Sequence, residues 1–160
     1  MVMTDREITN LDEIEELLNN ARVCRVALND GAFPYIVPMC FGYNLRGGKL
    51  ELYFITEEKG KKMDLLKVDN NAAFEIDKLL DIVKDTDTPP GFTVSYRSIA
   101  GTGVLENITG IDKITGINLI IKKYSESSAN PKYSEQVLNS FAVLKLTAAE
   151  VCCKEHITTG

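Results

Sequence analysis

The chain has 160 residues, of which 44% are hydrophobic and 26% are charged, and its formal net charge is -5 at pH 7. This length fits a single domain over residues 1–160 with its own hydrophobic core. The negative charge disfavours general nucleic-acid binding. No run approaches the about 18 apolar residues that span a membrane, and the N-terminal MVMTDREIT lacks the order of a signal peptide. We therefore expect a cytoplasmic protein.

The cysteines and the single histidine do not form a metal-binding pattern. Cys24, Cys40, Cys152 and Cys153 show no CxxC spacing, and His156 is the only histidine. No zinc or other metal site is expected from this set. Cys24 and Cys40 lie inside apolar runs, which predicts that both are small core residues. No hydrolase, metalloprotease or nucleotide-loop motif is present, so no catalytic residue is assigned.

The first elements are a helix and two strands. Thr9 is the predicted N-cap of an amphipathic helix, whose apolar positions are Leu11, Ile14, Leu17, Leu18 and Ala21. Residues 23–28 and 33–43 are predicted strands, joined by the hairpin signal Asn29-Asp30-Gly31. The second strand contains prolines, which cannot donate to a ladder, so it is predicted to be an edge, bulged or interrupted strand. Prolines can keep such an exposed edge from aggregating, and the edge can also offer backbone groups to a flat ligand.

Residues 49–66 suggest an anion site. A predicted strand over 49–56 is followed by Gly60, Lys61 and Lys62 at the start of a helix. A helix N-terminus offers free N–H groups and a positive dipole to a phosphate, and lysines add opposite charge. The alternative is a plain strand-to-helix connection with lysines on a solvated face. Glu57 and Glu58 favour this alternative, because carboxylates repel an anion.

The second half is predicted to be mostly strand. Residues 71–77 form a short strand, 78–91 an exposed excursion, and 92–108 a long strand that Gly101 and Gly103 bulge or bend. A helix follows, with Ile114, Ile117, Ile121 and Tyr124 on one face, then a polar loop at 125–133 and a last strand pair from 141 to about 153. Short turns between most strands favour antiparallel pairing, so a small antiparallel barrel is expected.

Four segments in this order resemble the FMN-binding split-barrel superfamily, which includes pyridoxamine 5'-phosphate oxidase. They are DREIT at 5–9, PYIVPMCFGY at 34–43, LYFIT with GKKMDLL between 52 and 66, and YRSIAGTG at 96–103. Within the superfamily the chain is most similar to the nitroimidazole-resistance (Nim-type) proteins. The resemblance implies a mainly β fold, a six-stranded antiparallel Greek-key split barrel with peripheral helices. It also implies a homodimer with two FMN molecules, each in a groove at the subunit interface.

The resemblance further implies roles for individual residues. Lys61 and Lys62 match the basic pair that holds the FMN phosphate, and Thr56 matches a hydroxyl at the same contact. Val37, Pro38, Met39 and Cys40 match the strand along the isoalloxazine ring. Ile55 lies beside the ring or ribityl chain, and Ser98 matches a polar position on the pyrimidine side of the flavin.

One departure separates the chain from many Nim-type sequences, which carry a histidine where this chain has Ile55. Isoleucine can neither donate nor accept a proton, so chemistry that depends on the histidine is not expected. FMN binding is expected to persist. Two functions therefore remain open: an FMN-dependent oxidoreductase with a small-molecule electron acceptor, and a non-catalytic flavin- or haem-binding sensor or store. Split barrels also host deazaflavins. The pyridoxal-phosphate contacts of the true oxidases have no match, so vitamin B6 oxidation is not expected.

Overall fold

The computed structural model describes residues 7–84, 86–125 and 131–158. The predicted polar loop at 125–133 lies partly outside these ranges, and so do residues 5 and 6 of the DREIT segment. The described strands form one antiparallel sheet in the order β2-β1-β5-β6-β7-β4-β3. They are β1 (Cys24–Leu28), β2 (Tyr35–Met39), β3 (Gly42–Arg46), β4 (Lys49–Thr56), β5 (Asn71–Lys84), β6 (Phe92–Ile108) and β7 (Ala142–His156). The predicted antiparallel split-barrel class is confirmed, with seven strands in place of six.

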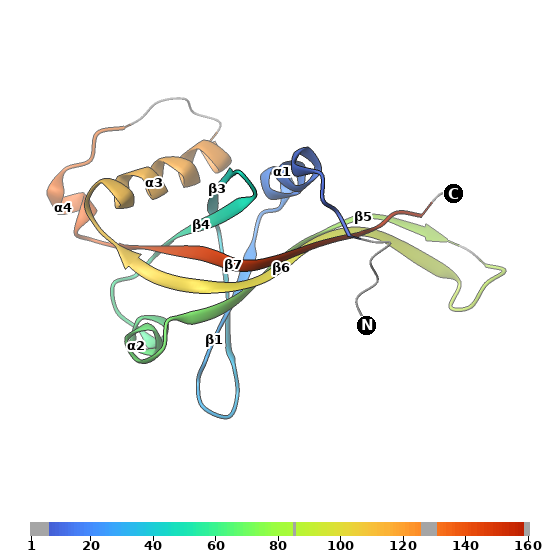
Figure 1. Ribbon diagram of the computed structural model, residues 1–160, viewed down its shortest axis with the longest axis horizontal. Helices are drawn as coiled ribbons and strands as arrows, with labels where there is room; N and C mark the ends of the chain where they lie inside the picture. Colours follow the sequence, from blue (N-terminus) through green and yellow to red (C-terminus); the bar gives the residue numbers. More distant parts are fainter. Residues whose placement is uncertain (1–6, 85, 126–130, 159–160) are drawn as a thin grey trace.

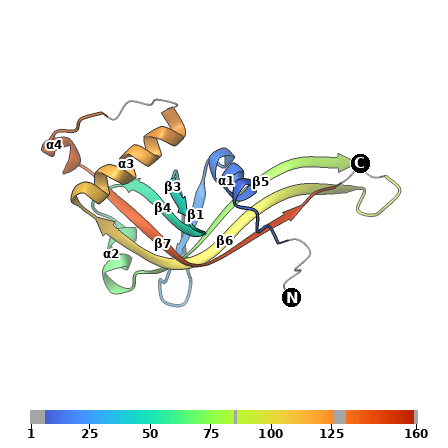
Figure 2. The same ribbon diagram turned by 45° about the horizontal axis from the view of Figure 1, so that its top comes forward.

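The helices cover the curled sheet from two sides. They are α1 (Leu11–Asn20), α2 (Lys61–Val68), α3 (Gly110–Ser125) and α4 (Glu135–Leu138). In Figure 1, α1 and α3 lie above the sheet and α2 lies below it; the view in Figure 2 agrees. A main core inside the sheet includes the fully buried Leu18, Phe41, Leu52, Phe54 and Ile99. A second cluster under α3 joins Tyr53, Ile117 and Val143.

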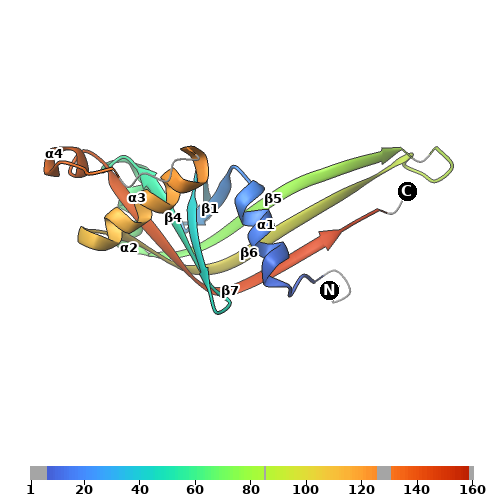
Figure 3. The same ribbon diagram turned by 90° about the horizontal axis from the view of Figure 1, so that it is seen from above.

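The strand predicted at 71–77 is longer than expected. β5 continues to Lys84 and pairs along its length with β6, so half of the predicted excursion is strand. After a register shift at Leu79/Asp81, residues 81–84 pair with residues 92–95 of β6, so the two segments satisfy each other's backbone groups. Figure 3 shows the resulting two-stranded arm extending beyond the barrel.

The strand predicted at 33–43 divides into β2 and β3 at Cys40–Phe41, beyond the prolines. The Phe41 ring is fully buried, and its backbone N–H donates to Tyr124 Oη (3.1 Å) instead of joining a ladder. At Gly42 the chain passes so close to α3 that a Cβ would lie 2.6 Å from the Ile120 nitrogen. Packing against α3 therefore breaks the strand, while β2 is an edge strand, as its prolines predict.

Smaller differences concern the ends of elements. Asn10, not Thr9, is the N-cap of α1, and its side chain accepts from Asp12 N at 2.9 Å. The predicted strand pair after residue 141 is the single long strand β7, which pairs with both β4 and β6. The predicted bulge is confirmed, because the β6–β7 register shifts at Thr102/Gly103. Among the described helices, none has the length and apolar character needed to cross a membrane.

Candidate functional site

A groove of about 540 Å³ lies where β2 approaches the end of β4 and the start of α2. β2 and β4 are not neighbours in the sheet, so only the curling of the sheet brings them together. The groove is lined by Tyr35, Val37, Pro38, Met39, Cys40, Ile55, Thr56, Glu57, Lys59, Gly60, Lys61 and Lys62. Every predicted cofactor residue except Ser98 is in this set.

The apolar wall of the groove comes from strand alternation in β2. Tyr35, Val37 and Met39 are half-buried or buried, whereas Ile36 between them is 61% exposed. β2 pairs only with β1 among the described strands, and the register sets Val37 opposite Val26. Its outer edge therefore keeps backbone donors and acceptors free beside an apolar surface, which suits a flat heteroaromatic ring.

The polar end of the groove is the N-terminus of α2. Gly60 is the N-cap, with φ 125°, and it offers no side chain to the first-turn N–H groups. The positive φ suits glycine and turns the chain sharply from β4 into the helix. Uncapped N–H groups and the helix dipole make this end favourable for an anion.

The two lysines of α2 have different surroundings. Lys61 Nζ lies 2.6 Å from Asp30 Oδ2 and 5.2 Å from the centre of the Tyr35 ring. The Asp30 carboxylate raises the pKa of Lys61. Lys62 is half-buried, and this burial lowers its pKa while Glu57 acts in the opposite direction. No acidic side chain in the described ranges forms an ion pair with Lys62.

Ser98 does not reach this groove within one chain. It lies half-buried on β6, between Asp77 of β5 and Lys154 of β7 in the register. β6 is separated from β2 and from β4 by other strands. The role assigned to Ser98 by resemblance therefore stays a prediction that requires a second chain.

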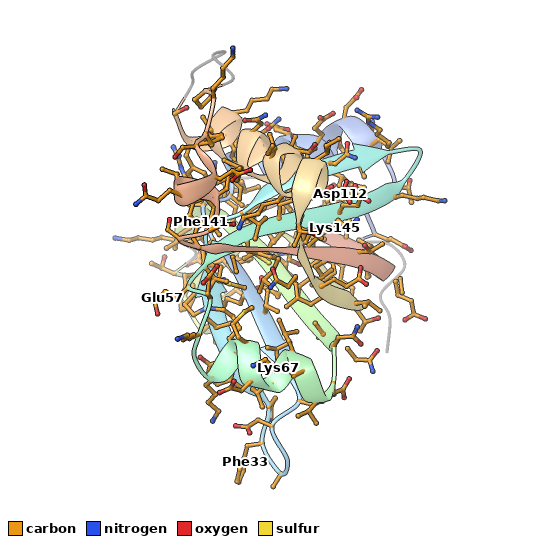
Figure 4. All side chains as sticks on the ribbon, turned by 90° about the vertical axis from the view of Figure 1, so that its left-hand side faces the viewer. Phe33, Glu57, Lys67, Asp112, Phe141 and Lys145 are labelled. Carbon is orange, nitrogen blue, oxygen red and sulfur yellow. The ribbon has the colours of Figure 1, made fainter. Side chains whose placement is uncertain are left out.

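Sequence reasoning assigned no role at the site to Tyr35 or Lys59. Alternation along β2 could have found Tyr35, since it shares a face with Val37 and Met39. Glu57 follows the end of β4, where Figure 4 shows it at the edge of the molecule, and it opposes an anion as predicted. Lys59 is exposed, and only the folding of the β4–α2 connection places it at the groove.

The two cysteines predicted for the core differ. Cys24 on β1 is fully buried, and desolvation raises the pKa of its thiol to about 12, with Glu75 adding to the effect. Cys40 is exposed at the end of β2 and lines the groove, so its predicted core position is wrong. The break in the strand turns Cys40 outward as Phe41 turns into the core. Among the described residues no group of three potential ligands could hold a metal ion.

The chain was compared with known families and structures. A family model described as pyridoxamine 5'-phosphate oxidase matches residues 10–155. None of the curated proteins compared with the chain matches it. Among solved structures, one from Bacteroides thetaiotaomicron, described as a candidate 5-nitroimidazole antibiotic resistance protein, has a TM-score of 0.78 at 23% identity, covering 93% of this chain and 86% of its own.

Two further structures share the fold. An FAD and haem binding protein from Mycobacterium smegmatis has a TM-score of 0.76 at 20% identity, covering 97% of this chain and 74% of its own. A flavocytochrome from Azotobacter vinelandii has a TM-score of 0.71 at 18% identity, covering 96% and 69%. At these identities the likeness concerns the fold, including the curled sheet that forms the groove.

Proposed function

The chain belongs to the pyridoxamine 5'-phosphate oxidase family, and on that premise we propose that it is an FMN-binding flavoprotein that acts as an oxidoreductase. The observation that carries this proposal is the groove between β2 and α2. It joins an apolar strand with a free edge to an uncapped helix N-terminus and two lysines. These are the features that a flat ring on a phosphorylated chain requires.

The residues present fit FMN at its phosphate end. A phosphate there would meet the first-turn N–H groups of α2 and the ammonium of Lys62, with Lys61 and the Thr56 hydroxyl beside them. Partial burial of Lys62 strengthens its interaction with an anion, since less water competes for the charge. Glu57 weakens that attraction, so the site depends on the helix N-terminus as well as on the lysines.

The residues also fit the ring end. Val37 and Met39 offer apolar contact, and the outer edge of β2 offers backbone N–H and C=O groups. Ile55, which is 42% exposed, adds a further apolar surface from β4. FMN, when bound, supplies the electron-transfer chemistry, and the protein positions the ring and limits its contact with water. The proposed acceptor is a small molecule.

We also propose that the protein is a homodimer in which the second chain completes the groove. Ser98 lies away from the groove of its own chain and would reach that of its partner. Support comes from exposed apolar side chains on β2, β5, β6 and β7, whose burial would favour association: Ile36, Leu79, Ile82, Phe92 and Val151.

A non-catalytic binding function is the second candidate, and Ile55 favours it. The groove carries an isoleucine where many Nim-type proteins have a histidine, and no histidine lies among its lining residues. A protein of this kind would hold a flavin, or haem as one neighbour of the same fold does, without turning over an acceptor.

Absorption spectroscopy of the purified protein, followed by titration with FMN, riboflavin and haem, tests the cofactor. We expect the visible bands of oxidised flavin and tighter binding of FMN than of riboflavin. A haem Soret band with no flavin affinity would overturn the proposal. Oxidation of NADH or NADPH with varied acceptors then separates the enzyme from the binding protein.

Sedimentation at micromolar concentration tests the assembly. We expect a dimer with and without FMN, and an unfolding temperature that rises with added FMN, because the ligand binds only the native state. A monomer that binds FMN tightly would contradict the shared groove.

A further inference from the structure

One of the two lysines at the proposed phosphate end of the groove, Lys61, already forms an ion pair with Asp30. Asp30 lies in the β1–β2 turn, far from α2 in the sequence, yet its Oδ2 is 2.6 Å from Lys61 Nζ. Tyr35 sits under the same ammonium at 5.2 Å. Lys61 therefore has a carboxylate and an aromatic face as partners before any ligand arrives.

A second contact between the same turn and α2 holds Asp30 in this place. Asn29 Nδ2 donates to Asp69 Oδ2 (2.7 Å), and Asp69 is the C-cap of α2. Asp69 is itself fixed, because its Oδ1 accepts from the Asn71 backbone N–H at 2.9 Å. The turn thus contacts both ends of α2. Figure 4 shows the hairpin, with Phe33 at its tip, beside the helix that carries Lys67.

Lys62 has no such partner. It is half-buried, its nearest acidic influence is Glu57, and no carboxylate in the described ranges pairs with it. A phosphate arriving at the groove therefore meets Lys62 without competition, but it must compete with Asp30 for Lys61.

We propose that Asp30 is a specificity-determining residue, which competes with the flavin phosphate for Lys61 and so limits the preference of the groove for phosphorylated over unphosphorylated flavin. This inference rests on the proposed FMN site. Lys62 and the N-terminal amides of α2 then carry most of the phosphate contact. Removal of the Asp30 charge frees Lys61 for the phosphate. The affinity for riboflavin, which has no phosphate, does not depend on this charge.

The test measures FMN and riboflavin affinity by flavin fluorescence in Asp30→Asn and in a matched control, Asp64→Asn. Asparagine suits the turn at position 30 and keeps the shape of the side chain. Asp64 lies on α2 and pairs with Lys67 at 3.5 Å, so its replacement removes the same charge near α2 without touching the Asp30–Lys61 ion pair. We expect Asp30→Asn to bind FMN about two- to fivefold more tightly, the range typical of exposed ion pairs. Riboflavin affinity and the control variant are expected to change little.

A double-mutant cycle with Lys61→Ala shows whether Asp30 affects FMN affinity through Lys61. In the Lys61→Ala background, Asp30→Asn is expected to give no gain in FMN affinity, because the freed lysine is absent. An equal gain in that background, or in Asp64→Asn, would assign the effect to net charge and overturn the inference. Weaker FMN binding by Asp30→Asn would also overturn it, since Asp30 would then position Lys61 for the phosphate. Absence of FMN binding in the wild type would instead reject the proposed function.

Discussion

Lysine and cysteine residues have different surroundings at the groove and in the region between α1 and α3. Lys123 on α3 donates to the Asn19 carbonyl (3.1 Å) and to the Ala21 carbonyl, and lies over the Phe41 ring at 4.6 Å. Lys62 at the groove has neither a carbonyl nor a carboxylate partner among the described contacts. A fully engaged lysine holds the fold together, and a half-buried lysine without a partner is available to a ligand.

Lys123 also supplies a positive charge at the C-terminal end of α1. The last turn of α1 contains no basic residue, and the ammonium that contacts its C-terminal carbonyls comes from α3. Burial lowers the pKa of Lys123 to about 8, and Arg22 adds to this shift, while the carbonyl contacts favour the protonated form. The cysteines repeat the contrast, with Cys24 enclosed and Cys40 at the groove.

The substitution Lys62→Ala is expected to have the largest effect and tests whether Lys62, unlike Lys123, serves the ligand. A charge-assisted contact contributes roughly 1.5–3 kcal/mol, so FMN affinity is expected to fall more than tenfold. Riboflavin affinity and the free energy of unfolding are expected to change little. Lys67→Ala is the control, since Lys67 is on the same helix and outside the groove lining. Titration with both flavins checks the result, and equal losses for FMN and riboflavin would refute a phosphate role.

Lys123→Met is expected to lower the stability of the fold and to leave FMN binding unchanged. Methionine keeps an apolar stem but leaves the Ala21 carbonyl without its donor, so the free energy of unfolding should fall by about 1–3 kcal/mol. FMN affinity should be little changed. Urea denaturation measures the loss, with the exposed neighbour Lys122→Met as control. A loss of flavin affinity without a loss of stability would remove the distinction between the two lysines.

The burial of Cys24 predicts a pH dependence of the free energy of unfolding. The pKa of Cys24 rises from 9.0 to about 12 in the native chain. Between these values the unfolded chain binds fewer protons than the native chain, so stability falls as the pH rises, by about 1.4 kcal/mol per pH unit from this thiol. Cys24→Ala should therefore show a shallower loss of stability above pH 9, even if its stability at pH 7 is lower.

Denaturant titrations at several pH values measure that slope. The assignment to burial would be wrong if Cys24→Ala and wild type lost stability in parallel.

Ile55→His is expected to change the chemistry of the groove more than its affinity for FMN. In the proposed binding mode the ring would meet apolar side chains and backbone at this position, so FMN affinity should stay within about tenfold, or ~1.4 kcal/mol. An imidazole can donate a proton near neutral pH, so reduction of a nitroimidazole should become faster. Anaerobic reoxidation of dithionite-reduced flavin by a nitroimidazole measures this. Rapid reoxidation by wild type would make the histidine dispensable, and slow reoxidation by both proteins would favour the binding protein.

The local features of the site can be predicted from the sequence. The glycine before two lysines predicted the start of α2, and the prolines predicted an edge strand, because φ restrictions and missing donors act within a few residues. Gly103 marked the bulge in the long strand β6. The family resemblance then grouped the groove residues, which spacing alone left open between a phosphate site and a solvated surface.

Which of these residues have partners depends on contacts between segments that are distant in the sequence. Asp30 meets Lys61 because the β1–β2 turn packs against α2, and Lys123 meets the end of α1 across about a hundred residues. Packing of Gly42 on α3 ended β2 and exposed Cys40, and residues 79–84 are strand because they pair with β6. Ion pairs and close packing join residues distant in the chain, so their effects depend on the fold and not on neighbouring residues.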